Sequence, residues 1–387
     1  MSDDARPPKV VLFANTDWYL YNFRLSLIRR LRDEGYDVLL ISPPGEYGAK
    51  LQALGFRWIA LPMQRRSLNP LREAALVNHI ARLLREERAD LIHGFTIKPA
   101  VYGGLAGRLA GVKGRVSAVA GLGWVFINPS LRARTLRPVV AALLRLALGG
   151  EGARLILQNP DDEALFARAK LVKRERVRVI KGSGVDCKRF TPPAASANPT
   201  APLRVLLAAR LLWDKGLREY VDAARALKAQ GRSIRFLLAG DPDPGNPAAV
   251  AVETIHGWTD EGLVEWLGHV ADMPALLQSI DVAVLPSYRE GLPKSLIEAA
   301  ACARALITTD TPGCREVVND GVEGFRVPVR DSSGLAQAIA RLDDDRGLVQ
   351  RMGEAARSRA LAEFDEEIVL DGTTRVYREL LSSRGDA

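Results

Sequence analysis

The sequence predicts an α/β protein of two domains, each built on a parallel β-sheet. Its 387 residues suffice for two domains of ordinary size, and 47% hydrophobic with 26% charged residues is typical of a globular protein. Short apolar runs alternate with amphipathic stretches, which is the pattern of repeated strand-helix-strand units. Residues 191–202, TPPAASANPTAP, separate two such series and have the composition of a linker.

The first series spans residues 1–190, the expected first domain. It begins with the apolar run Lys9–Asn15, which is typical of a strand buried on both faces. A loop over residues 16–24 is expected to lead into the first helix. Further strands are expected at Val38–Ile41, Arg57–Leu61, Asp90–Ile92, Arg115–Val119, Leu155–Gln158 and Val177–Ile180, and helices at Glu73–Arg88, Val101–Leu109 and Leu131–Leu148.

Several of these strands are followed by polar residues or glycines. The carboxyl ends of parallel strands line the crevice where ligands bind in such sheets. The first-domain candidates are therefore Asp17, His93, Thr96, Lys98, Gly121 and Gly123. The alternative for His93 is a packed core residue, because a lone histidine after a strand is more often structural.

The second series spans residues 203–365 and is followed by a terminal helix in residues 366–387. Strands are expected at Leu203–Ala208, Arg235–Ala239, Val264–Leu267, Val282–Leu285, Ala305–Thr309 and Gly324–Pro328. Helices are expected at Leu217–Gln230, from Pro293 or Lys294, from Gly313, and at Leu335–Leu342, Leu348–Phe364 and Val369–Leu381.

The most informative stretch is residues 281–303, DVAVLPSYREGLPKSLIEAAACA. It predicts a buried strand, a turn, a loop and a helix, with Glu290 in the loop and Glu298 inside the helix. Because Glu298 lies about one and a half turns from the helix start, both carboxylates can face one ligand. The backbone of residues 292–295 and the helix dipole offer an anion seat between them. This arrangement suggests a sugar nucleotide; the alternative is a surface helix with two solvated glutamates.

The run EGLPKSLIE and the following EAAAC resemble the family 4 retaining glycosyltransferases. The family adopts the GT-B fold, in which two Rossmann-like domains with parallel sheets face each other across a cleft and a terminal helix crosses back to the first domain. The blocks NTDWYLYNFR, HGFTIKPAVYG and AGLGWVF resemble a bacterial subgroup that extends polyprenyl-diphosphate-linked glycans.

The resemblance implies a metal-independent, retaining transfer. The donor would be a nucleotide sugar, UDP-linked, that gives a hexose or N-acetylhexosamine to a polyprenyl-diphosphate-linked sugar in surface-polysaccharide or glycoprotein assembly. Glu290 would contact the donor hexose, with Asp17 and His93 as further catalytic residues, and Thr96, Lys98, Gly121 and Gly123 would lie on the acceptor side. The expected donor-binding residues are Arg210, Lys215, Gly291, Leu292, Pro293, Lys294, Ser295 and Glu298.

Two positions depart from the family pattern. Relatives commonly carry a second histidine two residues after the first, and it contacts the donor sugar; here Phe95 occupies that position. Ala303 stands where relatives usually have glycine, and a local change in packing is expected there.

Charge is distributed unevenly along the chain. The net charge is +8, and residues 101–150 contain no acidic residue. Their basic residues are Arg108, Lys113, Arg115, Arg132, Arg134, Arg137 and Arg145. Such a segment can meet a nucleic acid, an anionic membrane surface or a phosphorylated substrate, and no nucleic-acid motif favours the first. We expect an anionic membrane surface as the partner, because residues 131–148 form a basic amphipathic stretch. The alternatives are a solvated basic face and, for residues 131–148, a core helix with exposed arginines.

The expected location is the cytoplasm, peripheral on the inner face of the cell membrane. The start of the chain, MSDDARPP, is polar, and the three cysteines show no CxxC pattern. No His/carboxylate spacing suited to a metal ion is present, so neither a metal nor a cofactor is expected. The rival hypotheses are a GT-B-type sugar-nucleotide 2-epimerase, a catalytically silent nucleotide-sugar or lipid-binding protein, and a nucleic-acid binder.

Overall fold

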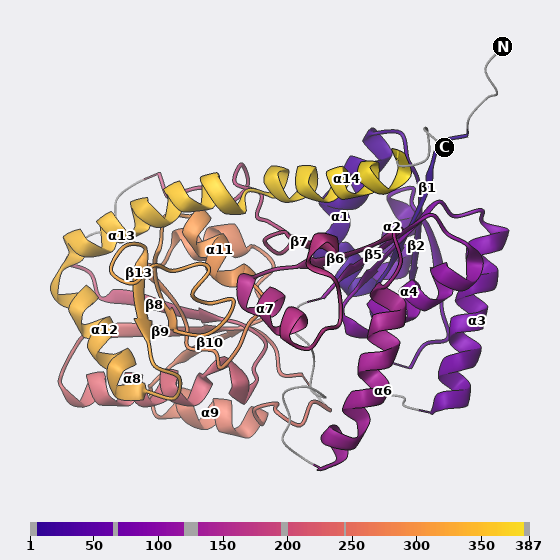
Figure 1. Ribbon diagram of the computed structural model, residues 1–387. Helices are drawn as coiled ribbons and strands as arrows, with labels where there is room; N and C mark the ends of the chain where they lie inside the picture. The colour runs from indigo at the N-terminus through magenta and orange to yellow at the C-terminus, as the bar shows by residue number, and fades with distance from the viewer. Residues whose placement is uncertain (1–5, 65–68, 120–130, 195–199, 244, 383–387) are drawn as a thin grey trace. The chain divides into compact units, whose positions relative to one another are not determined.

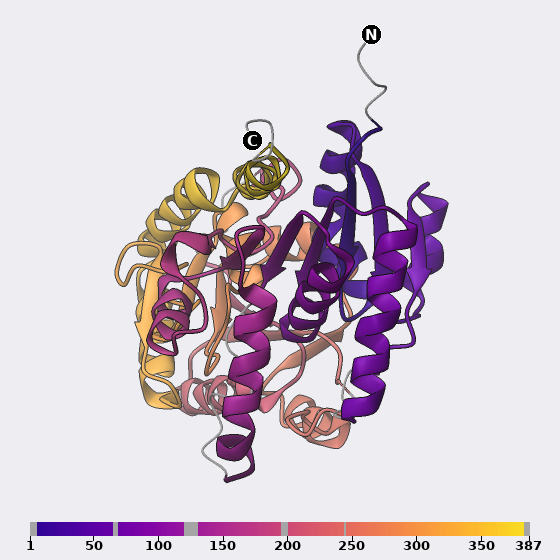
Figure 2. The same ribbon diagram turned by 45° about the vertical axis from the view of Figure 1, so that its right-hand side comes forward.

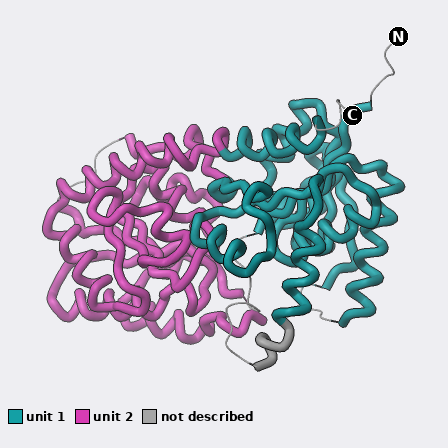
Figure 3. The backbone as a smooth tube through the Cα atoms, viewed as in Figure 1, with its two compact units in different colours: residues 1–183, 369–387 teal, residues 184–368 magenta. Residues whose placement is uncertain are grey.

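The computed structural model describes residues 6–64, 69–119, 131–194, 200–243 and 245–382, with the backbone alone for residues 131–136. The chain forms two compact units (Figure 3). Unit 1 comprises residues 1–183 and 369–387, and unit 2 comprises residues 184–368. In the described residues each unit contains one parallel sheet, of seven strands in unit 1 and six in unit 2.

This division differs from the expected boundary after residue 190. Residues 184–190 belong to unit 2, because Val185, Cys187 and Phe190 are buried in its core. The Arg357 guanidinium holds this segment by donating hydrogen bonds to the carbonyls of Phe190 and Cys187, at 2.8 and 3.0 Å.

Unit 1 is built on a sheet of strand order β3-β2-β1-β4-β5-β6-β7, with all pairs parallel. The two central strands, Lys9–Phe13 and Leu91–Phe95, are buried except at Lys9, as expected for strands covered on both faces. The strands are β1 Lys9–Phe13, β2 Asp37–Ser42, β3 Arg57–Ala60, β4 Leu91–Phe95, β5 Gly114–Ala118, β6 Ala153–Leu157 and β7 Val177–Val179.

Helices cover both faces of this sheet (Figures 1 and 2). One face carries α1 Asp17–Asp33, α2 Tyr47–Ala53 and α14 Glu366–Ser382. The other carries α3 Pro70–Glu86, α4 Ile97–Ala110, α6 Leu131–Leu148 and α7 Pro160–Arg168. A short 3-10 turn, Arg174–Arg176, precedes β7. The terminal helix α14 completes the unit 1 core, because Leu370, Val376, Tyr377 and Leu380 pack among residues of the sheet and α1.

The prediction of a loop over residues 16–24 is wrong. Helix α1 begins at Asp17, directly after Thr16, whose hydroxyl accepts a hydrogen bond from the Tyr19 N–H at 3.1 Å. Threonine caps helices in this way because its oxygen satisfies an N–H that the first turn leaves unpaired.

Unit 2 repeats the architecture with strand order β10-β9-β8-β11-β12-β13. The strands are β8 Leu203–Ala208, β9 Ile234–Ala239, β10 Glu265–Gly268, β11 Val282–Leu285, β12 Ala305–Thr309 and β13 Gly324–Val327. One face packs against α8 Leu217–Ala229, α9 Val252–Asp260 and α12 Ser332–Asp344. The other packs against α10 Met273–Gln278 and α11 Lys294–Ala301, and α13 Arg346–Arg359 with the π-helical turn Ala360–Phe364 contributes at its edge.

The predicted helix starting at Gly313 is also wrong. Residues 312–317 form successive turns, in which Arg315 N–H bonds to the Thr311 carbonyl and Val317 N–H to the Cys314 carbonyl. Gly313 has φ +82°, in the left-handed region, so it cannot itself be the first residue of a right-handed helix.

Both sheets reverse their strand order at one position. In unit 1 this switch point lies between β1 and β4, and in unit 2 between β8 and β11. Ligands of open α/β sheets bind outside the carboxyl ends of the strands at such points. None of the helices in the described part of the chain is long and apolar enough to span a membrane.

Helix α14 should contribute strongly to the stability of unit 1. Tyr377 is fully buried, and its truncation in Tyr377→Ala should lower the free energy of unfolding by about 3–5 kcal/mol through the cavity left behind. Arg375→Ala, at an exposed position of the same helix, is the control. Calorimetry of both variants should show a transition shifted only by Tyr377→Ala; equal shifts would mean that α14 is not part of the unit 1 core.

Candidate functional site

The best-defined group of predicted site residues lies at the switch point of unit 2. Lys215, at the end of the 3-10 turn Trp213–Lys215 after β8, forms an ion pair with Glu290, in the loop after β11. Nζ and Oε1 are 2.5 Å apart, and the side chains are only 19% and 12% exposed. The fold therefore brings together two candidates that are 75 residues apart in the sequence.

Backbone contacts hold these two loops together. The Asp214 carbonyl accepts hydrogen bonds from the Tyr288 N–H at 2.9 Å and from the Ser287 hydroxyl at 3.0 Å. Gly216 has φ +76°, and a Cβ at this position would lie 2.2 Å from the Pro286 carbonyl oxygen. Glycine is required here because of both its backbone angle and the close approach of the second loop.

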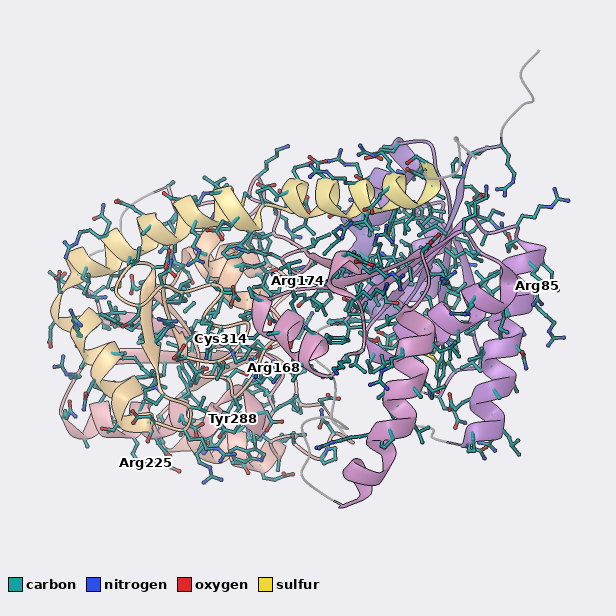
Figure 4. The ribbon with its side chains drawn as sticks, viewed as in Figure 1. Arg85, Arg168, Arg174, Arg225, Tyr288 and Cys314 are labelled. Atoms are coloured by element: carbon teal, nitrogen blue, oxygen red, sulfur yellow. The ribbon has the colours of Figure 1, made fainter. Side chains whose placement is uncertain are left out.

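A third loop, after β12, packs against the backbone of Glu290. A Cβ at Gly313 would lie 2.5 Å from the Glu290 carbonyl oxygen and 2.6 Å from that of Gly291. The Glu290 N–H bonds to the Pro312 carbonyl at 3.3 Å. Tyr288 and Cys314, labelled in Figure 4, belong to these two loops, and burial raises the pKa of the Cys314 thiol. The position of Glu290 is thus fixed by loops from three strands.

Helix α11 begins at Lys294, as predicted, with Pro293 as its N-cap and without a side-chain cap. The seat expected from the backbone of residues 292–295 has one donor fewer than an ordinary helix start, because proline has no N–H. The donors of the first turn are the amides of Lys294 and Ser295. A helix start that no side chain caps favours an anion.

Glu298 lies on the next turn of α11, where its side chain is 13% exposed. Burial raises the pKa of this carboxyl above its usual value, while nearby Lys294 and Arg189 act in the opposite direction. The Lys294 ammonium is 3.8 Å from the carboxylate, so it compensates only partly for the lost solvation. A carboxylate kept here is unfavourable for stability, which is characteristic of functional positions.

Arg210, the other predicted cation, lies on the same loop as Lys215 but is 61% exposed. It donates a hydrogen bond of 3.0 Å to the carboxylate of Asp243. Each of the two cations therefore holds a carboxylate. Loop positions of this kind allow an arginine to exchange an exposed carboxylate for a phosphate at little cost.

In unit 1, Asp17 lies at the switch point but is occupied by backbone groups. It is 4% exposed, and its oxygens accept hydrogen bonds of 2.8 Å from the N–H groups of Trp18, Tyr47 and Gly48. The contacts with Tyr47 and Gly48 cap helix α2. The catalytic assignment of Asp17 stays a prediction, and its observed contacts are structural.

His93 is a core residue, 1% exposed, whose Nδ1 is 2.5 Å from the Tyr377 hydroxyl. Burial, with a smaller effect of Arg24, lowers its pKa well below the usual value, so the imidazole is neutral at pH 7. Among the described residues its Nε2 has no hydrogen-bond partner. Arg24 itself is 6% exposed and stacks on the Phe95 ring, with 4.5 Å from its Cζ to the ring centroid.

The other first-domain candidates have different surroundings. Thr96, which follows β4, adopts φ +70°, an unfavourable backbone conformation for a β-branched residue. The Lys98 ammonium is 2.9 Å from Glu73 and donates to the Gln64 carbonyl at 2.7 Å. Gly121 and Gly123 lie outside the described residues. No group of three or more potential metal ligands occurs in the part of the chain that the structure describes.

Comparison with known proteins identifies the family. Residues 9–159 match the family model for glycosyl transferase 4-like proteins, and residues 202–345 match the model for glycosyl transferases group 1. A curated relative from Campylobacter jejuni is 30% identical over 374 residues, which cover 94% of this chain and 96% of the relative. The chain is a glycosyltransferase of this family. The relative is named N,N'-diacetylbacillosaminyl-diphospho-undecaprenol alpha-1,3-N-acetylgalactosaminyltransferase.

Other similar proteins agree with this assignment. An Escherichia coli UDP-Gal:alpha-D-GlcNAc-diphosphoundecaprenol alpha-1,3-galactosyltransferase is 24% identical to this glycosyltransferase, over 92% of each chain. Among solved structures, Anabaena HepE in complex with UDP matches 96% of the chain, and 100% of HepE is covered, with a TM-score of 0.77 and 21% identity. A Rickettsia africae glycosyltransferase matches 98% of the chain and is itself fully covered, with a TM-score of 0.79 and 20% identity. The predicted GT-B fold class with its two Rossmann-like domains is confirmed.

Several residues that support the candidate site were not singled out from the sequence. Gly313, Asp214 and Asp243 hold or pair with predicted residues of the glycosyltransferase, and Arg24 and Tyr377 surround His93. Of these residues only Gly313, a glycine shortly after a predicted strand, drew attention in the sequence, and it was interpreted as the start of a helix. The remaining contacts depend on loops that meet only in the folded chain.

The buried carboxyl of Glu298 gives a pH-dependent prediction for this glycosyltransferase. Because its folded pKa is raised, the folded state holds the proton more tightly, and stability falls as pH rises above the unfolded value of about 4.5. Glu298→Gln removes this loss. Its melting temperature should therefore exceed that of the wild type by a margin that grows from pH 4 to pH 7. The exposed Glu253→Gln is the control; a margin independent of pH would contradict the burial argument.

Proposed function

We propose that this glycosyltransferase moves a hexose or N-acetylhexosamine from a UDP-sugar to a polyprenyl-diphosphate-linked sugar. One observation carries the proposal: the Campylobacter jejuni relative, matched over almost the full length of both chains, is named for an undecaprenyl-diphosphate-linked acceptor. The Escherichia coli relative is named for the same lipid and for a UDP-linked donor. None of these relatives favours the epimerase alternative.

The donor diphosphate is assigned to the loop after β8 and the start of α11. Before the donor binds, Lys215 neutralises Glu290; the diphosphate would then attract the Lys215 ammonium and the Arg210 guanidinium, a point charge and a bidentate fork that suit two adjacent phosphates. The amides of Lys294 and Ser295 add donors at the positive end of a helix. These groups would stabilise the departing nucleoside diphosphate, which is the electrostatic task that usually dominates catalysis.

Glu290 and Glu298 are given different roles. Glu290, once separated from Lys215, would contact the donor hexose and stabilise positive charge at its anomeric carbon. Glu298, with its partly desolvated carboxyl, would bind the ribose hydroxyls of the nucleotide. A retaining outcome means that the new bond forms on the face from which the diphosphate leaves.

Unit 1 is assigned to the acceptor and to the membrane. Lys98 and the strained Thr96 lie at the carboxyl end of β4, and Lys98 would exchange Glu73 for a phosphate of the acceptor. Basic residues of unit 1 would hold the enzyme on the inner, anionic face of the cell membrane, where the lipid-linked acceptor resides. Arg145 of α6, one of those expected to face lipid, donates to the carbonyls of Lys170 and Ala169, at 2.9 and 3.2 Å.

A transfer assay tests the proposed function. The enzyme would be incubated with UDP-, GDP- and ADP-sugars, with and without synthetic polyprenyl-diphosphate-linked acceptors, and products would be identified by mass spectrometry. Transfer from a UDP-sugar to the lipid-linked acceptor, with the α-configuration retained, is expected. Inversion, or epimerisation of the donor without transfer, would contradict the proposal.

Glu290→Gln should abolish transfer without reducing UDP affinity. The substitution removes charge needed in the transition state but leaves Lys215 free for the diphosphate. Glu298→Gln should instead chiefly weaken UDP binding. Calorimetry and initial rates on both variants separate the two roles. A collapse of UDP affinity in Glu290→Gln, with unchanged affinity in Glu298→Gln, would mean that the roles are reversed.

Transfer should survive treatment with EDTA. Fixed cations and helix amides occupy the position that a divalent ion would take on the diphosphate, so no metal is needed for this charge. Rates would be compared before chelation, after it, and after addition of Mg²⁺ or Mn²⁺. Loss of activity that either ion restores would overturn the metal-independent mechanism.

A further inference from the structure

A basic pocket lies at the amino edge of the unit 1 sheet, away from every candidate discussed above. It has a volume of about 580 Å³ and is formed where α4 leads into β5, where the chain enters β6, and at the end of α14. Its charged lining residues are Arg108, Lys113, Arg115, Glu151 and Arg154. The candidates Asp17 and Thr96 lie at the opposite, carboxyl edge, about 15 Å away along strands of five residues.

Three of these cations have no counter-charge among the residues that the structure describes. No carboxylate in the described residues pairs with Arg108, Lys113 or Arg115, whereas Arg154 binds Glu379 through a contact of 2.6 Å. Arg108 and Lys113 are exposed and Arg115 is partly buried, and like charges around one cavity repel each other, which a bound anion would offset.

Arg115, the least exposed of these three cations, is held by two backbone carbonyls. Its guanidinium donates to the Gly149 carbonyl at 3.1 Å and to the Val112 carbonyl at 3.4 Å, while its Nε is buried with no partner in the described part of the chain. Burial lowers its pKa, and the positive charges of Arg108 and Arg176 act in the same direction. An anion would relieve each of these effects.

Glycines allow the loop before β6 to close over this arginine. A Cβ at Gly150 would lie 2.9 Å from an Arg115 Nη atom, and a Cβ at Gly152 would lie 2.2 Å from the Lys113 carbonyl oxygen. Gly150 also has φ +92°, which side chains rarely adopt. The loop backbone therefore packs closely against the Arg115 guanidinium, and the exposed Arg108 and Lys113 side chains complete the basic lining of the pocket.

We propose that this pocket binds a phosphate-bearing anion, at a site separate from those assigned to the donor and the acceptor. Guanidinium groups bind phosphate oxygens in pairs, and a lysine adds a mobile point charge. The volume is within the range of small-molecule sites and admits a diphosphate or a phospholipid headgroup. The shared chemistry is the phosphate group, whether it is free in solution or part of a lipid.

The test uses inorganic pyrophosphate and vesicles as probes. All proteins carry Arg210→Gln and Lys215→Gln, so that unit 2 does not contribute phosphate contacts. On this background, Arg108→Gln with Lys113→Gln should lower pyrophosphate affinity at least tenfold by calorimetry. Glu151→Gln, at an exposed position in the lining, should raise affinity, because it removes the like charge that opposes the anion. The matched control is Arg72→Gln with Arg82→Gln, two exposed arginines on α3 outside the pocket.

Vesicle co-sedimentation distinguishes the two sources of phosphate. If the ligand is a lipid headgroup, binding to phosphatidylglycerol vesicles should also fall in the Arg108→Gln, Lys113→Gln protein, and pyrophosphate should displace the parent protein; neutral phosphatidylcholine vesicles should not bind. A change in pyrophosphate affinity alone assigns the site to a soluble phosphate compound. Equal binding of both probes by all proteins, or an equal loss in the α3 control, would overturn the proposal and leave a solvated basic surface. Neither outcome bears on the transfer reaction, so failure here is distinct from failure of the proposed function.

Discussion

The ion pair between Lys215 and Glu290 is the interaction on which the candidate site depends. It joins the loops that follow β8 and β11, the two strands between which the order of the unit 2 sheet reverses. Each partner alone would be a poorly solvated charge, since neither side chain is more than 19% exposed. Together they keep a cation and a carboxylate in place in the absence of ligand. In the function proposed here, a donor diphosphate would compete for the cation and thereby release the carboxylate for the sugar.

Several residues around the candidate site adopt backbone angles or buried positions that lower the stability of the fold but hold the site residues in place. Gly216 and Gly313 accept left-handed backbone angles so that neighbouring carbonyls can approach, and Glu298 is kept in a position that raises its pKa. In unit 1, Thr96 holds an angle that glycine would adopt more easily. Strain of this kind persists where surrounding packing overdetermines it, and it is concentrated at functional sites. Ala303 shows the same feature away from the site: its φ of +55° explains why relatives usually have glycine there.

Much of the architecture could be predicted from the sequence. Buried parallel strands are continuous apolar runs, whereas in amphipathic helices apolar residues recur about every three to four positions. Strands Leu203–Ala208, Val282–Leu285 and Ala305–Thr309 have the predicted bounds. Errors occurred where local chemistry opposes the pattern: the Thr16 cap starts α1 inside an expected loop, and the left-handed angle of Gly313 excludes it as the first residue of the expected helix. Motif spacing singled out Glu290, and the resemblance to the family singled out Lys215, but only the fold shows them as a pair. The alternative of a packed core position for His93 agrees with its burial, but the sequence does not reveal its partner Tyr377 or that Asp17 caps α2.

The UDP affinity of Lys215→Met, measured by calorimetry, tests the central claim most directly. Loss of a charge-assisted contact of about 1.5–3 kcal/mol should weaken binding roughly 10- to 100-fold. The matched control is Arg225→Met on α8, whose ion pairs with Asp222 and Glu261 involve none of the site residues, and it should bind UDP like the wild type. The account predicts a selective loss in Lys215→Met. Unchanged UDP affinity in that variant would show that the ion pair is only structural and that the donor binds elsewhere.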